Sequence, residues 1–255
     1  MILLKHLLFL SLFYNLTYAI EIKSLHHAVD IAGKQRMFTQ RMLKDYAMIG
    51  MENSFDKPDE DLNKTIENFE NHLDALHDYT HNHKIIKSTQ KVRKIWLPIK
   101  RILQEEPNIN QALKLQESLE LLLQASDDTT HLFAKETGEK SGIIIDISGR
   151  QRMLSQRMAS LYMLKVWGVK NRNFQEKMDR SMKLFESSLK RLQSSKFNTK
   201  EITQRLKEVE KSFIFFKIMN KTSHTFIPTL IYKKSNDILE NMNIVTKNYV
   251  DLKIK

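Results

Sequence analysis

The chain has 255 residues, which allows one or two domains, and it contains 6 glycines, 4 prolines and no cysteine. The scarcity of glycine and proline favours helices over strands, while the lack of cysteine excludes disulfides and c-type haem attachment through C-x-x-C-H. A formal net charge of +11 suits an anionic ligand, an anionic membrane surface or nucleic acid as the partner.

Residues 1–19 have the pattern of a secretory signal peptide. Lys5 supplies the positive charge, a mostly apolar run extends from Leu7 to Leu16, and Ala19 is a small residue at the cleavage point. The apolar run is short for a membrane span, which needs roughly 20 residues, so an uncleaved N-terminal anchor is the alternative. We therefore expect the rest of the chain to be a soluble periplasmic protein, and export argues against nucleic acid as the partner.

Apolar residues spaced three and four apart predict four helices in the first half of the chain. Their expected ranges are 22–50, 64–82, 88–103 and 109–133. Gly50 and a polar turn that contains Pro58 should close the first helix. Pro98 should kink the third helix or cut it short.

The second half repeats this plan, with helices expected at 143–167, 173–195, 199–220 and 230–252. The simplest packing is all-α, as two tandem up-down-up-down four-helix bundles. We expect the first bundle to span residues 20–137 and the second residues 138–255. The intervening TGEKSG segment, 137–142, is the candidate hinge, and its composition leaves open a nearly continuous helix between the bundles.

A sequence repeat supports this division of the chain. Residues 30–42 read DIAGKQRMFTQRM, and residues 146–158 read DISGRQRMLSQRM, 116 residues later. Nine of the thirteen positions are identical. Phe69 and Glu70 recur at the same offset as Phe185 and Glu186. The chain is therefore one module of about 115 residues present twice.

The repeated helix has small or apolar residues on two opposite faces. Ile31, Phe38 and Met42 share the face that should pack in the helix's own bundle. The opposite face carries Gly33 in the first copy and Gly149 in the second, although a mid-helix glycine costs about 1 kcal/mol relative to alanine. We expect the glycines to permit close approach to a partner helix, which is the other copy, within the chain or across a homodimer.

The same face carries an arginine in each copy, Arg36 and Arg152. Buried without a partner, each guanidinium group would cost several kcal/mol. Asp30 and Asp146 project elsewhere on the helical wheel, so we expect no carboxylate near either arginine and a small planar anion that bridges them. A solvated or snorkelling arginine is the alternative. The expected ligand-binding residues are Arg36, Arg152, Gly33, Gly149, Gln40 and Gln156, with the glutamines adding neutral hydrogen bonds.

The repeated string resembles the signature of the PilJ-type domain, the periplasmic N-terminal module of type IV pilus chemotaxis transducers. It is also similar to the P-box of periplasmic nitrate/nitrite sensor kinases. The resemblance covers two helices strongly and implies a four-helix sensor whose first helices bind nitrate between them. It implies that Arg36 and Arg152 match the nitrate-binding arginine, and Gly33 and Gly149 its neighbouring glycine. Several glutamines differ from the nitrate-sensor version and leave the identity of the anion open.

A histidine-rich stretch could in principle form a metal site. His77 and His81 have the i, i+4 spacing of a metal site, beside Asp74 and Asp78, but the second module lacks equivalent ligands, which favours a solvated polar face. Arg41 and Arg157 lie off the glycine face and should contact neighbouring helices or carboxylates. No nucleophile elbow, phosphate loop or acid/base pair is present, so we expect no enzyme and no cofactor.

The sequence therefore predicts a periplasmic ligand-sensing protein. It would bind a small oxyanion such as nitrate or nitrite between its repeated helices and signal to a separate envelope or chemotaxis protein. The alternative is a helical interaction module with no small ligand. Sensing requires Arg36 and Arg152 to converge in a buried pocket without a protein carboxylate, whereas the alternative requires them to be exposed or already paired.

Overall fold

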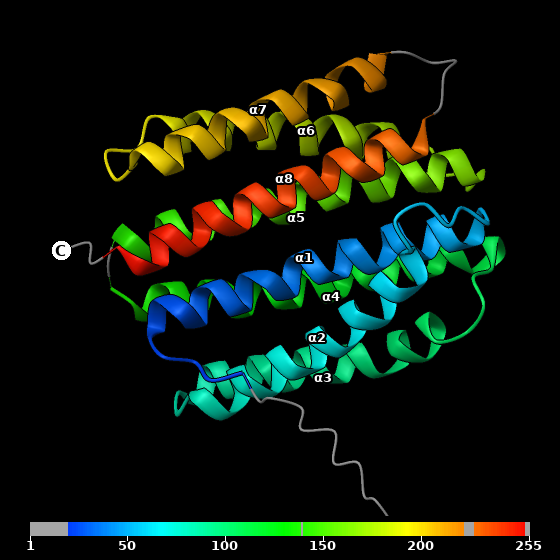
Figure 1. Cartoon of the computed structure of the whole chain (residues 1–255). Coiled ribbons are helices and arrows are strands. Elements are labelled where there is room, and N and C mark those ends of the chain that lie inside the picture. Colours follow the sequence, from blue (N-terminus) through cyan, green and yellow to red (C-terminus); the bar gives the residue numbers. More distant parts are fainter. Residues whose placement is uncertain (1–19, 139, 222–226, 253–255) are drawn as a thin grey trace, which may run out of the picture.

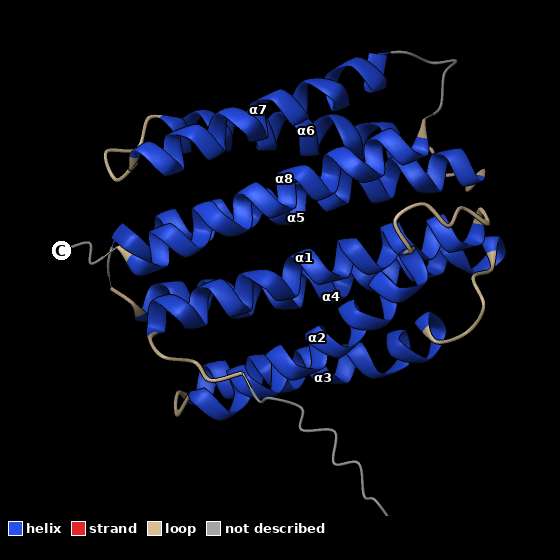
Figure 2. Cartoon of the chain, in the orientation of Figure 1, coloured by secondary structure: helices blue, strands red, loops and turns tan. Residues whose placement is uncertain are grey.

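The computed structural model describes residues 20–138, 140–221 and 227–252, and these residues form eight helices and no strand (Figure 2). The first four helices are α1 (Leu25–Gly50), α2 (Pro58–Tyr79), α3 (His83–Leu103) and α4 (Ile109–Glu136). The other four are α5 (Lys140–Trp167), α6 (Phe174–Gln193), α7 (Lys200–Lys221) and α8 (Pro228–Asp251). The expected all-α tandem bundles are confirmed. The expected signal peptide lies outside the described residues, and no described helix is long and apolar enough to cross a membrane.

The expected starts of α2 and α3 were wrong by five residues or more. α2 begins at Pro58, six residues before the expected start. Proline fits the first helical position, where its φ is already suitable and its missing N–H would have no partner, and the acidic residues 59–61 that follow suit the positive end of the helix dipole. α3 begins at His83, five residues before the expected start, where the side chain of Asn82 caps it by accepting from the Lys84 N–H. It ends at Leu103 as expected and is not cut short by Pro98.

The helices are stacked in four layers of two (Figure 1). The order of the layers is α2–α3, α1–α4, α5–α8 and α6–α7, so the first helix of each repeat lies at the centre. α1 makes its most extensive helix contact with α5, and the two run parallel. Gly138, with φ of +65°, lies where the chain reverses between α4 and α5, so the two bundles are not joined by a continuous helix.

Matching hydrogen bonds recur in the two repeats and hold the central helices in place. The Gln35 side chain donates to the backbone oxygen of Phe69 at 2.9 Å, and Gln151 donates to that of Phe185 at 3.0 Å. Each bond ties the first helix of a repeat to its second helix. Because these glutamines are buried and bonded within their own bundles, they support the helix arrangement.

An aromatic contact joins the far ends of α1 and α5. The Trp167 ring packs edge-on to Tyr46, with centroids 5.9 Å apart. A methyl group on Gly50 would lie 2.6 Å from Cε2 of Trp167 and closer still to two other ring atoms. Gly50 is therefore needed for space at the joint between the repeats, in addition to its position at the end of α1.

We predict that Gly50→Ala destabilises the fold by about 1–3 kcal/mol, the usual cost of overpacking. The cost should disappear in the background of Trp167→Leu, because alanine then gains helix propensity without a ring to displace. Urea unfolding of the four proteins in this double-mutant cycle measures the effect. An equal loss in both backgrounds would contradict the role given to Trp167.

Candidate functional site

α1 and α5 approach each other closely at the repeated glycines. A methyl group added to Gly33 or to Gly149 would lie 4.0 Å from the Cα atom of the other glycine. It would also lie 3.2–3.4 Å from Nη2 atoms of both Arg36 and Arg152. The glycines therefore lie at a close helix contact, as expected, and leave space in which the two guanidinium groups converge.

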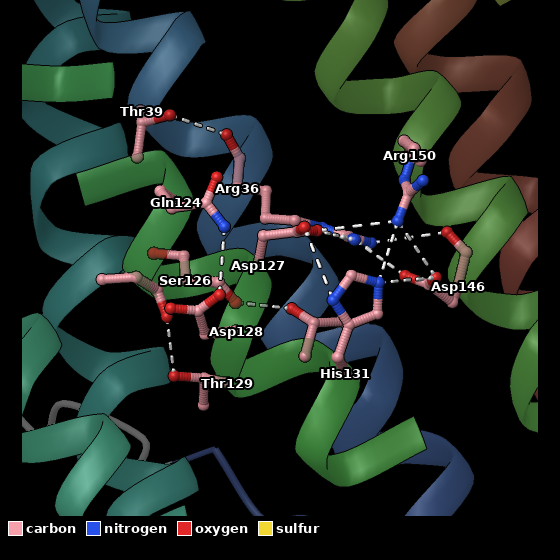
Figure 3. A network of polar contacts seen from close by, with 12 residues as sticks. Arg36, Thr39, Gln124, Ser126, Asp127, Asp128, Thr129, His131, Asp146 and Arg150 are labelled. Atoms are coloured by element: carbon pink, nitrogen blue, oxygen red, sulfur yellow. Dashed lines mark hydrogen bonds and ion pairs between the residues drawn. The ribbon is translucent and has the colours of Figure 1, made fainter. Parts of the chain in front are cut away.

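Both arginines are fully buried, and each carries a carboxylate partner from the other repeat. Arg36 Nη1 lies 2.7 Å from Oδ1 of Asp146, and Arg152 Nη2 lies 2.7 Å from Oδ1 of Asp30. Arg36 Nη1 also donates to Asp127 Oδ1 at 2.6 Å, as Figure 3 shows. The expectation that no carboxylate lies near either arginine was wrong.

The error has a geometric cause. Side chains on a helix lean toward its N-terminus, and an arginine is long enough to span more than one turn. Arg36 therefore reaches the level of Asp146 on the parallel helix, six residues before its own counterpart there. A helical wheel gives the direction of each side chain from its own axis and does not give this reach.

The charges around the arginines are mutually stabilised. Burial acts to raise the pKa of Asp30, but the charges of Arg152 and Lys34 outweigh it and lower this pKa to about 2. At Asp146, burial likewise acts to raise the pKa of the carboxyl, but the charges of Arg36 and Arg150 outweigh it and lower this pKa. Both aspartates are therefore ionised at neutral pH and neutralise the arginines.

The two buried arginines and the side chains that pair with them form an arginine centre, and its two halves differ in charge. Asp127 in α4 corresponds, at an offset of 116 residues, to Asn243 in α8. Arg36 thus has two carboxylates, whereas Arg152 has Asp30 and the amide oxygen of Asn243, which accepts from Nη1 at 3.1 Å. The half of the centre beside α8 therefore carries less negative charge.

The expected glutamines lie one turn further along and bond elsewhere. Gln156 donates to the backbone oxygen of Ser235 at 3.0 Å, and Gln40 accepts a hydrogen bond from Ser160 at 3.4 Å. The structure therefore brings Gly33, Gly149, Arg36 and Arg152 together and places Gln40 and Gln156 in neighbouring contacts between helices.

The second arginine of each copy behaves as expected. Arg41 Nε donates to Asp61 in α2 at 2.8 Å, and Arg157 Nη2 lies 2.8 Å from Glu120 in α4. Of the histidines weighed as metal ligands, His77 hydrogen-bonds Thr89. Over the described ranges, no group of three or more histidines and acidic residues could hold a metal ion.

A buried charge pair in α1 was not predicted from the sequence. Lys44 and Asp45 are both fully buried, with Nζ 3.6 Å from Oδ1. α8 supplies their partners: Lys44 donates to Asn236 at 2.8 Å, and the Tyr232 hydroxyl donates to Asp45 at 2.8 Å. In the second repeat, Ser160 and Leu161 occupy the equivalent positions, so a comparison of the copies would have revealed the pair.

A family model described as "Type IV pili methyl-accepting chemotaxis transducer N-term" (PilJ) matches residues 21–127 and 135–213. The two matched segments begin shortly before α1 and α5, the repeated helices of the centre. Neither the curated proteins nor the solved structures contain a match to the chain.

We predict that either Lys44→Ser or Asp45→Leu costs about 3–5 kcal/mol, because each leaves one buried charge without its partner. The double variant carries the residues of the second repeat, Ser160 and Leu161. It should lose much less than the sum of the single losses, because no charge is left behind. Urea unfolding of all four proteins tests this, and additive losses would show that the two side chains are not a coupled pair.

The same pair predicts a pH dependence of stability. Burial raises the pKa of Asp45 from 3.8 to about 7, so its contribution to stability, full below pH 3.8, is lost as the pH rises through 7. Burial lowers the pKa of Lys44 from 10.5 to about 8, so its contribution, full above pH 10.5, is lost as the pH falls through 8. The pair should stabilise the fold least between pH 7 and 8. Subtracting the pH profile of the double variant from that of the wild type should reveal this minimum, and a flat difference would contradict it.

Proposed function

Since the chain belongs to the PilJ family, the N-terminal domains of type IV pili methyl-accepting chemotaxis transducers, we propose that it is a non-catalytic sensory module of the periplasm. It acts through helix–helix interaction and passes its signal to a separate envelope protein. The arginine centre serves as an internal clamp between the repeats, and a small anion is not required there.

The observation that carries this proposal is the carboxylate already present on each guanidinium group. Sensing by a bridging oxyanion requires buried arginines that lack such a partner. Arg36 and Arg152 are buried, but Asp146, Asp127 and Asp30 neutralise them. The existing pairs therefore favour the interaction module over the simple oxyanion sensor.

An oxyanion would have to displace an aspartate in order to bind. Nitrate and a carboxylate both present planar oxygens to a guanidinium edge, so the exchange is stereochemically feasible. However, it would leave a released carboxylate in a buried site, and such a charge without a partner costs several kcal/mol. The free-energy cost of displacing an aspartate therefore opposes nitrate binding at this centre.

Oxyanion sensing remains the second candidate because the two arginines converge. Their Nη2 atoms lie 3.3 and 3.4 Å from the same position, that of a methyl group added to Gly33. Like charges at such separation repel, and an anion between them would relieve the repulsion. A ligand that released one aspartate would also distinguish two states of the helix pair, as ligand-driven signalling requires.

We predict that titration with nitrate, nitrite, sulfate and chloride gives no saturable heat that depends on Arg36. Calorimetry of the wild type, Arg36→Gln and Arg152→Gln tests this, with Arg36→Lys as the control that keeps the charge and loses the planar fork. Circular dichroism establishes that each variant is folded.

Saturable binding of one anion, lost in both glutamine variants, would overturn the clamp proposal and establish a shared oxyanion site. In that case Arg36→Lys should also bind weakly, because lysine cannot present two parallel donors to a planar anion.

A further inference from the structure

We infer that a groove between the start of α1 and the end of α8 binds the carboxylate group of a small organic acid. The groove has a volume of about 590 Å³, within the usual range for small-molecule sites. Lys23 and Lys34 line it from one side, Lys247 lines it from the other, and Ile244 and Val250 supply apolar surface. This inference goes beyond the proposed function, which assigns the sensory module no ligand.

Three lysines and two aspartates, Asp30 and Asp251, line the groove, which leaves it an excess of positive charge. Asp30, on its wall, already pairs with Lys34 at 2.9 Å and with buried Arg152. Lys23 and Lys247 form no ion pair with any residue that the structure describes. An anion bound there would therefore gain charge-assisted hydrogen bonds.

The first repeat shows what fills the equivalent position. There the Asp127 carboxylate lies 2.6 Å from Arg36, 3.5 Å from His131 and 3.8 Å from Arg150 (Figure 3). The carboxylate is thus held by three nitrogen-bearing side chains, from α1, α4 and α5. Asp127 is part of the chain, so this half of the centre needs no external anion.

At an offset of 116 residues, the three nitrogen-bearing side chains recur and the carboxylate does not. The counterpart of Arg36 is Arg152, that of His131 is Lys247, and that of Arg150 is Lys34. The counterpart of Asp127 is Asn243. The neutral amide of Asn243 accepts from Arg152 Nη1 at 3.1 Å and lines the groove. Arg152 is buried and does not line the groove, so a carboxylate from outside would lie beside Asn243 and meet Lys34 and Lys247, where it would supply the charge that Asn243 lacks.

The chemistry of the ligand follows from these counterparts. In the first repeat, Asp127 shows that a planar carboxylate fits among side chains of this kind. Lys23, which also lines the groove, can meet a second negative charge. Ile244 and Val250 suit a short hydrocarbon body next to it. We therefore expect small mono- and dicarboxylic acids as ligands.

The test is calorimetric titration of the full chain with acetate, succinate and benzoate at millimolar concentration. The wild type should bind one equivalent of at least one acid. Asn243→Asp should weaken binding at least about tenfold, as expected when a charged hydrogen-bonding position is already filled, and should raise the midpoint of thermal unfolding. Lys247→Ala should also weaken binding, whereas Lys207→Ala, on the exposed surface of α7, controls for net charge.

The first repeat supplies a control variant. Asp127→Asn removes a carboxylate that lies outside the groove and should leave binding in the groove at one equivalent. Absence of saturable binding by the folded wild type, or binding that Asn243→Asp leaves unchanged, would overturn the inference. Binding in the groove should persist in Arg36→Gln, whereas a shared oxyanion site would lose its ligand in that variant, so the two proposals fail independently.

Discussion

The two halves of the molecule depend on the reciprocal ion pairs between α1 and α5. Arg36 pairs with Asp146, and Arg152 pairs with Asp30, so each repeat neutralises the buried charge of the other. Buried pairs of this kind add little net stability compared with an apolar contact, but the loss of one member leaves a costly charge. Any slip of α1 along α5 would separate both pairs at once. The pairs therefore fix the register of the two helices, and Gly33 and Gly149 make that register possible.

Most of the architecture could be predicted from the sequence because the repeat is long and the helices are strongly periodic. α1 was expected to be buried on two sides because apolar and small residues lie on its opposite faces. One face packs in its own bundle, so a helix from the other repeat was needed to cover the second face. The expected start of α2 was wrong because Pro58 occupies its first position and opens the helix. The end of α3 at Leu103 was predicted correctly although Pro98 lies inside that helix.

The partners of the arginines could not be predicted from the same pattern. Asp30 and Asp146 belong to the repeated string, but their role depends on the stagger between two parallel helices, which no single helical wheel contains. Asp127 lies in α4, outside the string, and only folding brings it to Arg36. For Arg41 and Arg157, the kind of partner was predictable, because the neighbouring helices of each bundle carry carboxylates.

The differences between the repeats locate the part of the molecule where the two halves cannot be equivalent. Where the first repeat has Asp127, the second has Asn243. Where the first repeat has Lys44 and Asp45, the second has Ser160 and Leu161. Both changes lie where α1 faces α8: Asn243 borders the groove, and the Lys44–Asp45 pair is held by Tyr232 and Asn236 of α8. A symmetric dimer of identical modules would present each feature twice. A duplicated single chain can keep one copy as a charge-balanced structural element and vary the other, so the α1–α8 boundary is free to carry a function while the α4–α5 boundary maintains the fold.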